Sequence, residues 1–141
     1  MTAVMPFTSI DLCHLLEERR MHELELLTDL TDEQLRGVAM RDVERPIWEL
    51  GHVGWFQEYW ILRHLDGADP SMVGSDALYD SAKMYTHERG ELAFPSRSET
   101  LEYTSAILRR CVERLSSSEP DPEETYSYLL SIFHEDMHSE T

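Results

Sequence analysis

The sequence predicts an all-α protein, a four-helix bundle with a long crossover between its second and third helices. Apolar residues recur at three- and four-residue steps in four segments, and capping-box residues stand at two expected helix starts. A connection of about thirty residues with glycine and proline breakers separates the second segment from the third. No segment alternates as a strand would. At 141 residues the chain is expected to form one domain, residues 1–141.

The first expected helix runs from about residue 8 to residue 30, with leucines at positions 12, 15, 16, 26 and 27. A short helix should follow, because Thr31 and Gln34 have the spacing of a capping box. The second long helix opens at Pro46, a residue suited to a first helical turn, and continues to Leu65.

The crossover covers residues 66–95, and its length would let the second and third helices run other than as antiparallel neighbours. The third helix begins at a capping box formed by Ser96 and Glu99. The fourth follows the acidic, proline-containing segment EPDPEE. One side of this last helix carries its apolar residues, which are Tyr126, Leu129, Leu130, Phe133 and Met137.

The composition excludes several classes of partner. With 12 basic and 28 acidic residues the formal net charge is 12 − 28 = −16, and such a surface repels nucleic acid and anionic membranes. The acidic residues are spread along the chain, as expected for a solvated exterior. Neither a signal peptide nor an apolar run of about 20 residues is evident. Cys13 and Cys111 are expected to be reduced, so we expect a soluble, cytoplasmic protein.

The motif HEDMH places His134 and His138 one helical turn apart on one face, which suits two neighbouring metal ligands. Leu130 and Met137 share that face, so the imidazoles are expected to point inward or to the edge of the core. A zinc peptidase with this motif would take its third ligand from residues further on, and only three residues follow His138. We therefore expect an upstream third ligand.

His52 is the strongest candidate, because it lies mid-helix among aromatic residues in WELGHVGWF. Gly51 and Gly54 flank it and cost helix stability, which suggests that a ligand or another backbone approaches closely there. The alternative is an aromatic core stripe with one hydrogen-bonded histidine. For the remaining histidines, exposed or solvated positions are the simpler interpretation; these are His14, His22, His64 and His87.

The segments PIWELGHVGWFQEYWIL and HEDMHSE, in this order and separation, resemble the amino-terminal DinB-like domains of the sulfoxide synthases of ergothioneine biosynthesis and their ovothiol and selenoneine relatives. The resemblance covers essentially the whole chain. It implies a DinB-like bundle in which His52, His134 and His138 hold a mononuclear non-haem Fe(II), although zinc or nickel would also suit three histidines. It further implies an O2-using enzyme that joins the sulfur of a cysteine-type thiol to the imidazole of a histidine betaine, giving a sulfoxide.

Other residues of the two motifs are expected to surround the ligands. Glu135 is expected to be either solvated or a hydrogen-bonding partner of a ligand, and Glu140, which completes the H-x-E ending, a surface acid or such a partner. Trp55 and Phe56 are expected to form pocket wall and core. Family enzymes continue into a second domain of the formylglycine-generating-enzyme type, of which this chain has none, so we expect a fragment with little or no turnover alone. Its uncovered face would favour a homodimer.

Two alternatives remain open from the sequence. One is a stand-alone DinB-like thiol S-transferase, which uses a similar three-histidine site with zinc or nickel to activate a small thiol. The other is a metal-free helical interaction module with structural histidines.

Overall fold

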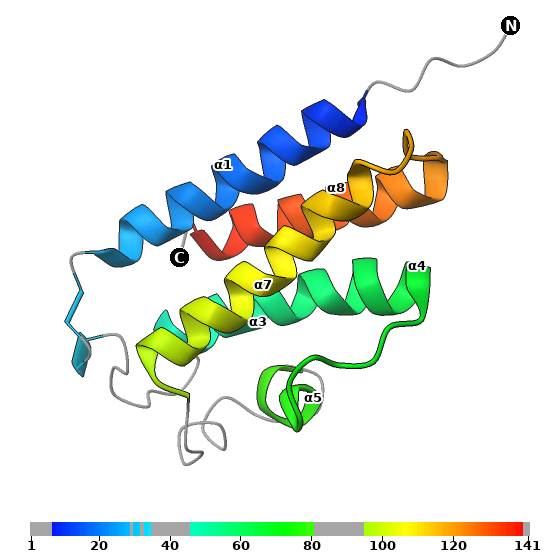
Figure 1. Ribbon diagram of the computed structural model, residues 1–141. Helices are drawn as coiled ribbons and strands as arrows, with labels where there is room; N and C mark the ends of the chain where they lie inside the picture. The colour runs from blue at the N-terminus through cyan, green and yellow to red at the C-terminus, as the bar shows by residue number, and fades with distance from the viewer. Residues whose placement is uncertain (1–6, 29, 32, 35–45, 81–94, 140–141) are drawn as a thin grey trace, which may run out of the picture.

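A computed structural model describes residues 7–28, 30–31, 33–34, 46–80 and 95–139, and it confirms the all-α bundle, with no strand in these segments. The long helices pack side by side along their lengths (Figure 1). In chain order the elements are α1 (Ser9–Thr28), α3 (Pro46–Gln57) continuing through η1 (Glu58–Arg63) and α4 (His64–Asp66), α5 (Ser75–Tyr79), α7 (Arg97–Leu115) and α8 (Pro122–Ser139).

The long crossover joins two parallel helices, α3 and α7. Gly54 lies against Thr104, and nearer the carboxyl ends Asp66 pairs with Arg114 at 2.9 Å. The α1 and α8 helices are also parallel to each other and run opposite to α3 and α7 (Figure 1). A connection between parallel helices must travel the length of the bundle, which explains why the crossover is long.

Both capping boxes predicted from the sequence are confirmed. Ser96 accepts a hydrogen bond from the Glu99 amide, and the Glu99 carboxylate accepts one from the Ser96 amide at 3.0 Å. Thr31 and Gln34 make the same reciprocal pair at 2.8 and 3.1 Å. Most of the short helix expected after Thr31 lies outside the described residues.

The second long helix contains a π turn that the sequence did not predict, at Glu58–Arg63. A π turn takes in one residue more than an α turn, so the residues after it change their direction around the helix. The neighbouring Ile61 and Leu62 are both buried here.

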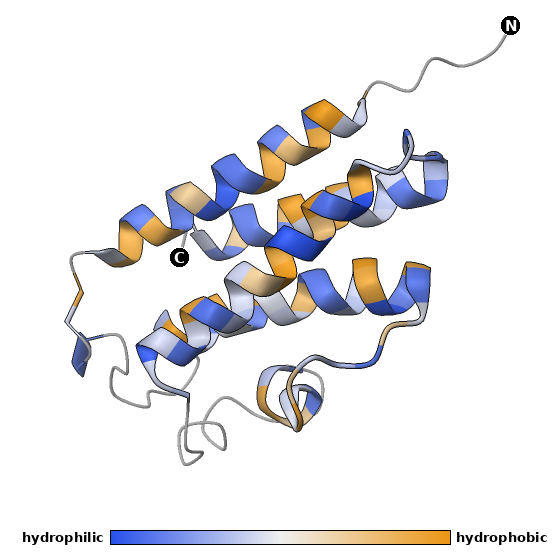
Figure 2. Cartoon of the chain, in the orientation of Figure 1, coloured by the Kyte–Doolittle hydropathy of each residue, from blue (hydrophilic) through white to orange (hydrophobic). Residues whose placement is uncertain are grey.

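One half of the bundle has an apolar core drawn from all four long helices. Figure 2 shows apolar residues recurring along one side of α1. The core residues are Leu12, Leu16, Ile61, Leu62, Ile107, Cys111, Leu115, Tyr128 and Ile132. Burial raises the pKa of the Cys111 thiol to about 12, so this side chain acts as a small apolar residue.

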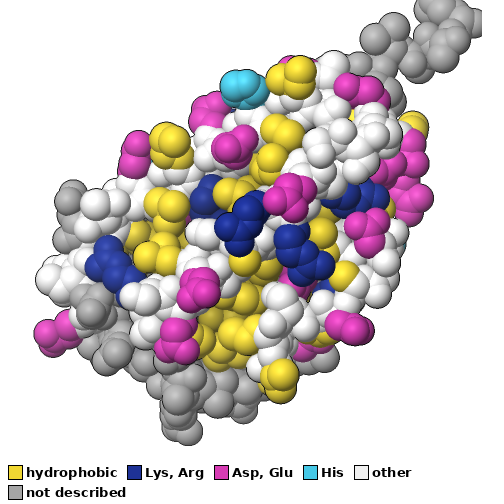
Figure 3. Space-filling view, viewed as in Figure 1, with side chains coloured by type: hydrophobic (Ala, Val, Ile, Leu, Met, Phe, Trp, Pro, Cys, Tyr) yellow, Lys and Arg dark blue, Asp and Glu magenta, His cyan; other side chains and the backbone are white. Residues whose placement is uncertain are grey.

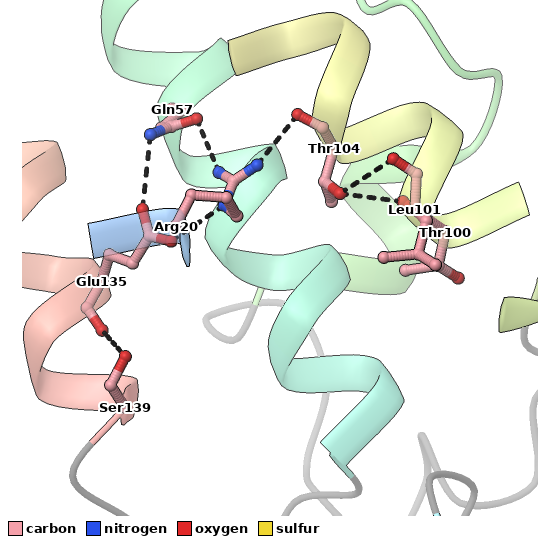
Figure 4. Close-up of polar contacts among 7 residues, drawn as sticks. All are labelled: Arg20, Gln57, Thr100, Leu101, Thr104, Glu135 and Ser139. Carbon is pink, nitrogen blue, oxygen red and sulfur yellow. Dashed lines mark hydrogen bonds and ion pairs between the residues drawn. The ribbon is translucent and has the colours of Figure 1, made fainter. Parts of the chain in front are cut away.

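A polar layer crosses the middle of the bundle and centres on Arg20 of α1, which is 3% exposed. Its guanidinium donates hydrogen bonds to Glu135 of α8 at 2.8 Å, to the side-chain oxygen of Gln57 of α3 at 2.8 Å, and to the carbonyl of Thr104 of α7 at 3.0 Å (Figure 4). One side chain of α1 thus bonds to each of the other three long helices.

This layer changes the expected orientation of α8. The helix turns Glu135 inward to bond with Arg20, so part of the side expected to be apolar faces outward, although Leu129 still packs against the core. Tyr126, Phe133 and Met137 are 65, 60 and 65% exposed. The expectation that Met137 marks an inward face was therefore wrong.

The surface carries acidic, basic and apolar side chains intermingled over the face seen in Figure 3, as expected for a solvated exterior. Among the described residues, no helix combines the length and the apolar character needed to span a membrane.

Gly54 is predicted to be required where α3 meets α7. A Cβ at this position would lie 2.6 Å from Thr104 Cγ2 and 3.3 Å from Thr104 Cα. Gly54→Ala should therefore lower the free energy of unfolding by about 1–3 kcal/mol through overpacking, against a helix-propensity gain of about 1 kcal/mol. Urea unfolding measures this. Adding Thr104→Ser removes Cγ2 and should restore part of the loss; a single variant more stable than the wild type would contradict the packing.

Arg20→Met should cost about 3–5 kcal/mol of unfolding free energy, because it leaves the Glu135 carboxylate buried without its cation. The neighbouring Arg19 is the matched control: it pairs with Asp136 at 2.7 Å, but both side chains are partly exposed, at 28 and 38%. Arg19→Met should cost no more than about 1 kcal/mol. Equal losses in the two variants, measured by urea unfolding at pH 7, would show that the polar layer has no special role.

Candidate metal centre

The structure brings His52 of α3 together with His134 and His138 of α8. The Nε2 atom of His134 lies 3.0 Å from Nε2 of His52 and 3.1 Å from Nε2 of His138. One ligand atom from each residue falls within 4.8 Å of the other two. Residues 82 positions apart in the sequence therefore present the same ring nitrogen to one point.

His52 is held by a backbone acceptor. Its Nδ1 lies 2.7 Å from the carbonyl oxygen of Tyr79, which can only accept, so Nδ1 carries the proton and Nε2 keeps its lone pair. The ring stacks on Trp48 with centroids 4.5 Å apart and planes 12° apart. Burial lowers the pKa of His52 to about 4, so the side chain is neutral at pH 7.

His134 is held by stacking. Its ring lies 3.7 Å from that of Phe56 and is tilted by only 6°. Its Nδ1 is buried without a hydrogen-bond partner in the described part of the chain. Burial, with the neighbouring His52 and His138, lowers the pKa of His134 to about 2, so this side chain is also neutral at pH 7.

The third histidine, His138, lies at the edge of the cluster and is 22% exposed in its side chain. Its Nε2 faces the shared point, and its Nδ1 lies 3.9 Å from a carboxylate oxygen of Glu49 in the first turn of α3.

The donor set suits a metal ion. Imidazole nitrogens bind Zn²⁺ at about 2.0–2.1 Å, so two of them would stand about 2.9 Å apart at a right angle and about 3.4 Å apart at a tetrahedral angle. The Nε2 separations of 3.0 and 3.1 Å lie between these two values. At this spacing the nitrogens can either share a proton in an N–H···N hydrogen bond or bind one cation together.

The other sequence candidates lie around the cluster in different roles. Glu135 is fully buried and bonded to Arg20, so the solvated alternative does not hold, and its side chain extends into the polar layer (Figure 4). Trp55 is 5% exposed and donates its indole N–H to Asp76 at 2.7 Å. Phe56 stacks on His134. Glu140 lies outside the described residues.

Histidines away from the cluster stand largely as expected. His14 and His22 are exposed, and His64 faces Glu123 at 3.6 Å; His87 lies outside the described residues. Glu23, next to His22 in the sequence, instead turns its side chain into the bundle beside Glu135 and is 4% exposed.

Sequence reasoning missed Tyr79 and Arg20. Tyr79 contacts His52 through its backbone carbonyl, which any residue type would supply, so the sequence does not indicate this role. Arg20 lies among charged residues in EERR, and only its place one turn from the buried Leu16 distinguished it.

Glu23 and Glu135 form a buried carboxyl pair. Burial, the hydrogen bond with Glu135 and the charge of Glu135 raise the pKa of Glu23 to about 10. The native protein thus keeps a proton that the unfolded chain releases above its ordinary pKa of 4.5. The contribution of Glu23 to the free energy of unfolding is fully present below pH 4.5 and is lost as the pH rises toward 10.

Glu23→Gln should therefore raise the unfolding free energy at pH 8, by on the order of 1 kcal/mol or more, and change it little at pH 4. A neutral amide can donate to Glu135 as the protonated acid does. Thermal unfolding across pH 4–9 measures the difference, with the exposed Glu25→Gln as control. A pH-independent effect would show that Glu23 ionises normally.

Comparison with known proteins places the chain in a family. A model of the DinB superfamily matches residues 15–141. The chain is 27% identical to a hercynine oxygenase of Mycobacterium tuberculosis over 131 residues, 92% of this chain and 30% of that protein. It is 28% identical to the hercynine oxygenase of Mycolicibacterium smegmatis over 97 residues, 67% of this chain and 22% of that protein.

A hercynine oxygenase of Mycolicibacterium thermoresistibile is 25% identical over 143 residues, 100% of this chain and 32% of that protein. The chain thus spans about a third or less of the length of these relatives. With the bundle, the parallel crossover and a superfamily match over nearly all of its length, the chain belongs to the DinB superfamily.

Proposed function

We propose that this chain is the metal-binding domain of a non-haem iron, O2-using enzyme that joins a cysteine-type thiol to the imidazole of a histidine betaine. The convergence of three Nε2 atoms from α3 and α8 carries the proposal. The relatives named hercynine oxygenase support this substrate class, because hercynine is a histidine betaine.

His52, His134 and His138 would hold the metal. Three imidazoles occupy half of an octahedral site and add no charge, which leaves room for an anionic thiolate and a second small molecule. Iron in such a site supplies the activation of O2 and the redox chemistry. Zinc or nickel would fit the same nitrogens, and a metal-dependent thiol transferase is the alternative function.

The protein groups around the site would keep it in order. The Tyr79 carbonyl holds the proton on Nδ1 of His52, which leaves Nε2 for the metal. Phe56 fixes the plane of His134 by stacking. Trp48 and Phe56 also shield this side of the cluster from water, which limits competing oxidation of the thiol.

The outward side of α8 suggests where the remaining parts of such an enzyme would lie. Tyr126, Phe133 and Met137 are mostly exposed on the helix that carries two of the histidines. Exposed apolar patches commonly mark interfaces. We propose that a second domain of the formylglycine-generating-enzyme type covers this side and supplies most of the substrate pocket; a homodimer through the same side is the alternative.

Anaerobic titration with Fe(II) tests the metal site directly. The wild-type chain should bind one equivalent. Replacing any one of the three histidines by alanine should weaken binding by more than about 100-fold, since loss of an outer hydrogen-bonding partner alone costs 10–100-fold. His64→Ala, which removes an imidazole outside the cluster, is the control and should bind as the wild type does. Wild-type protein that binds no metal would favour a metal-free module.

The reaction itself is tested by O2-dependent loss of cysteine or γ-glutamylcysteine together with a histidine betaine. The assay should use the chain and the complete open reading frame that contains it. Product formation with iron supports the proposal, whereas thiol transfer with zinc and without O2 consumption would support the transferase.

A further inference from the structure

The three histidines are held in different ways on the side away from the shared point. His52 meets a backbone carbonyl, and His134 is stacked on Phe56. His138 instead faces a carboxylate: its Nδ1 lies 3.9 Å from Glu49 Oε1, and each of these side chains is 22% exposed. An anionic side chain thus lies within 4 Å of the Nδ1 of His138.

Glu49 is well placed to act on this ligand. It lies in the first turn of α3, three residues before His52, so one helix provides both a histidine of the cluster and the carboxylate that faces a histidine of α8. A cavity of about 290 Å³ lies beside the pair, and Glu23, Glu49, His138 and Ser139 line part of it. The side chain of Glu49 therefore borders open space.

We propose that Glu49 is a positioning residue for the metal centre, which accepts a hydrogen bond from Nδ1–H of His138 and thereby directs its Nε2 toward the metal. The inference rests on the proposed metal site. When Nε2 binds a metal, only Nδ1 can carry the proton, and that N–H becomes a stronger donor. The present distance exceeds a hydrogen bond by about 0.7 Å, a shift that the neighbouring cavity permits.

The carboxylate would contribute in two ways. It fixes the tautomer and the ring orientation of the ligand at the edge of the cluster, where packing restrains it least. It also increases the basicity of the imidazole and offsets part of the charge of a cation held by three neutral ligands.

The test compares Glu49→Gln with the wild type in Co(II) titrations followed by visible absorption. The affinity should fall by about 10–100-fold, and the Co(II) spectrum should change, because the amide is a neutral and weaker acceptor. Glu123→Gln is the matched control, since Glu123 faces the imidazole of His64, at 3.6 Å and away from the cluster. The control should bind Co(II) as the wild type does.

A second measurement separates positioning from folding. In the Zn(II)-loaded protein with ¹⁵N-labelled histidine, Glu49→Gln should move the Nδ1–H resonance of His138 and leave that of His52 unchanged. Thermal unfolding of the metal-free variants should stay within about 2 °C of the wild type, as for a small surface effect.

The outcomes distinguish the two proposals. If the wild type binds Co(II) and Glu49→Gln binds it equally tightly with the same spectrum, the role of Glu49 is overturned and the metal site stands. If the wild type binds no metal, both proposals are overturned together. A weaker affinity with an unshifted His138 resonance would also overturn positioning, because the carboxylate would then act only as a distant charge.

Discussion

The ion pair between Arg20 and Glu135 is the constraint on which the rest of this bundle depends. The arginine lies on α1 and bonds to α3, α7 and α8 at once, so it sets how the helices stand relative to one another. Glu135 directly follows His134, and Gln57 lies five residues after His52 on α3. The bonds that join α3 and α8 to Arg20 therefore also fix how closely the two imidazoles can approach.

A buried ionic layer is a costly way to stabilise a bundle, since apolar residues of the same volume often serve as well or better. Its advantage here is that its hydrogen bonds are directional. A guanidinium donates along fixed lines in one plane, whereas leucines would accept many small shifts of one helix along another. A site whose nitrogens stand about 3 Å apart tolerates few such shifts. The bond to Arg20 explains why α8 turns Glu135 inward, an orientation that leaves Phe133 and Met137 outside.

Much of the fold follows from local sequence signals, and the failures have physical causes. Periodicity located the long helices, and the capping boxes at Thr31 and Ser96 located two starts, because both depend on neighbouring residues only. The spacing of the histidines on α8 indicated their shared face for the same reason. The inward side of α8 could not be predicted, because it depends on Arg20, a partner 115 residues away. The burial of Glu23 was not predicted, because the sequence does not distinguish a glutamate that keeps its proton from one that is ionised.

The aromatic motif around His52 shows how the crossover reaches the site. Trp48 and Trp55 each donate an indole N–H to an oxygen of α5, at 2.7 Å. Between them, Gly51 has no side chain because the ring of Tyr79, also in α5, occupies that space. Trp48 and Trp55 therefore attach α5 to α3, and α5 places the Tyr79 carbonyl against Nδ1 of His52. A crossover that only connected two parallel helices would need no fixed path. Here its α5 segment is bonded to α3, in a position where it orients His52.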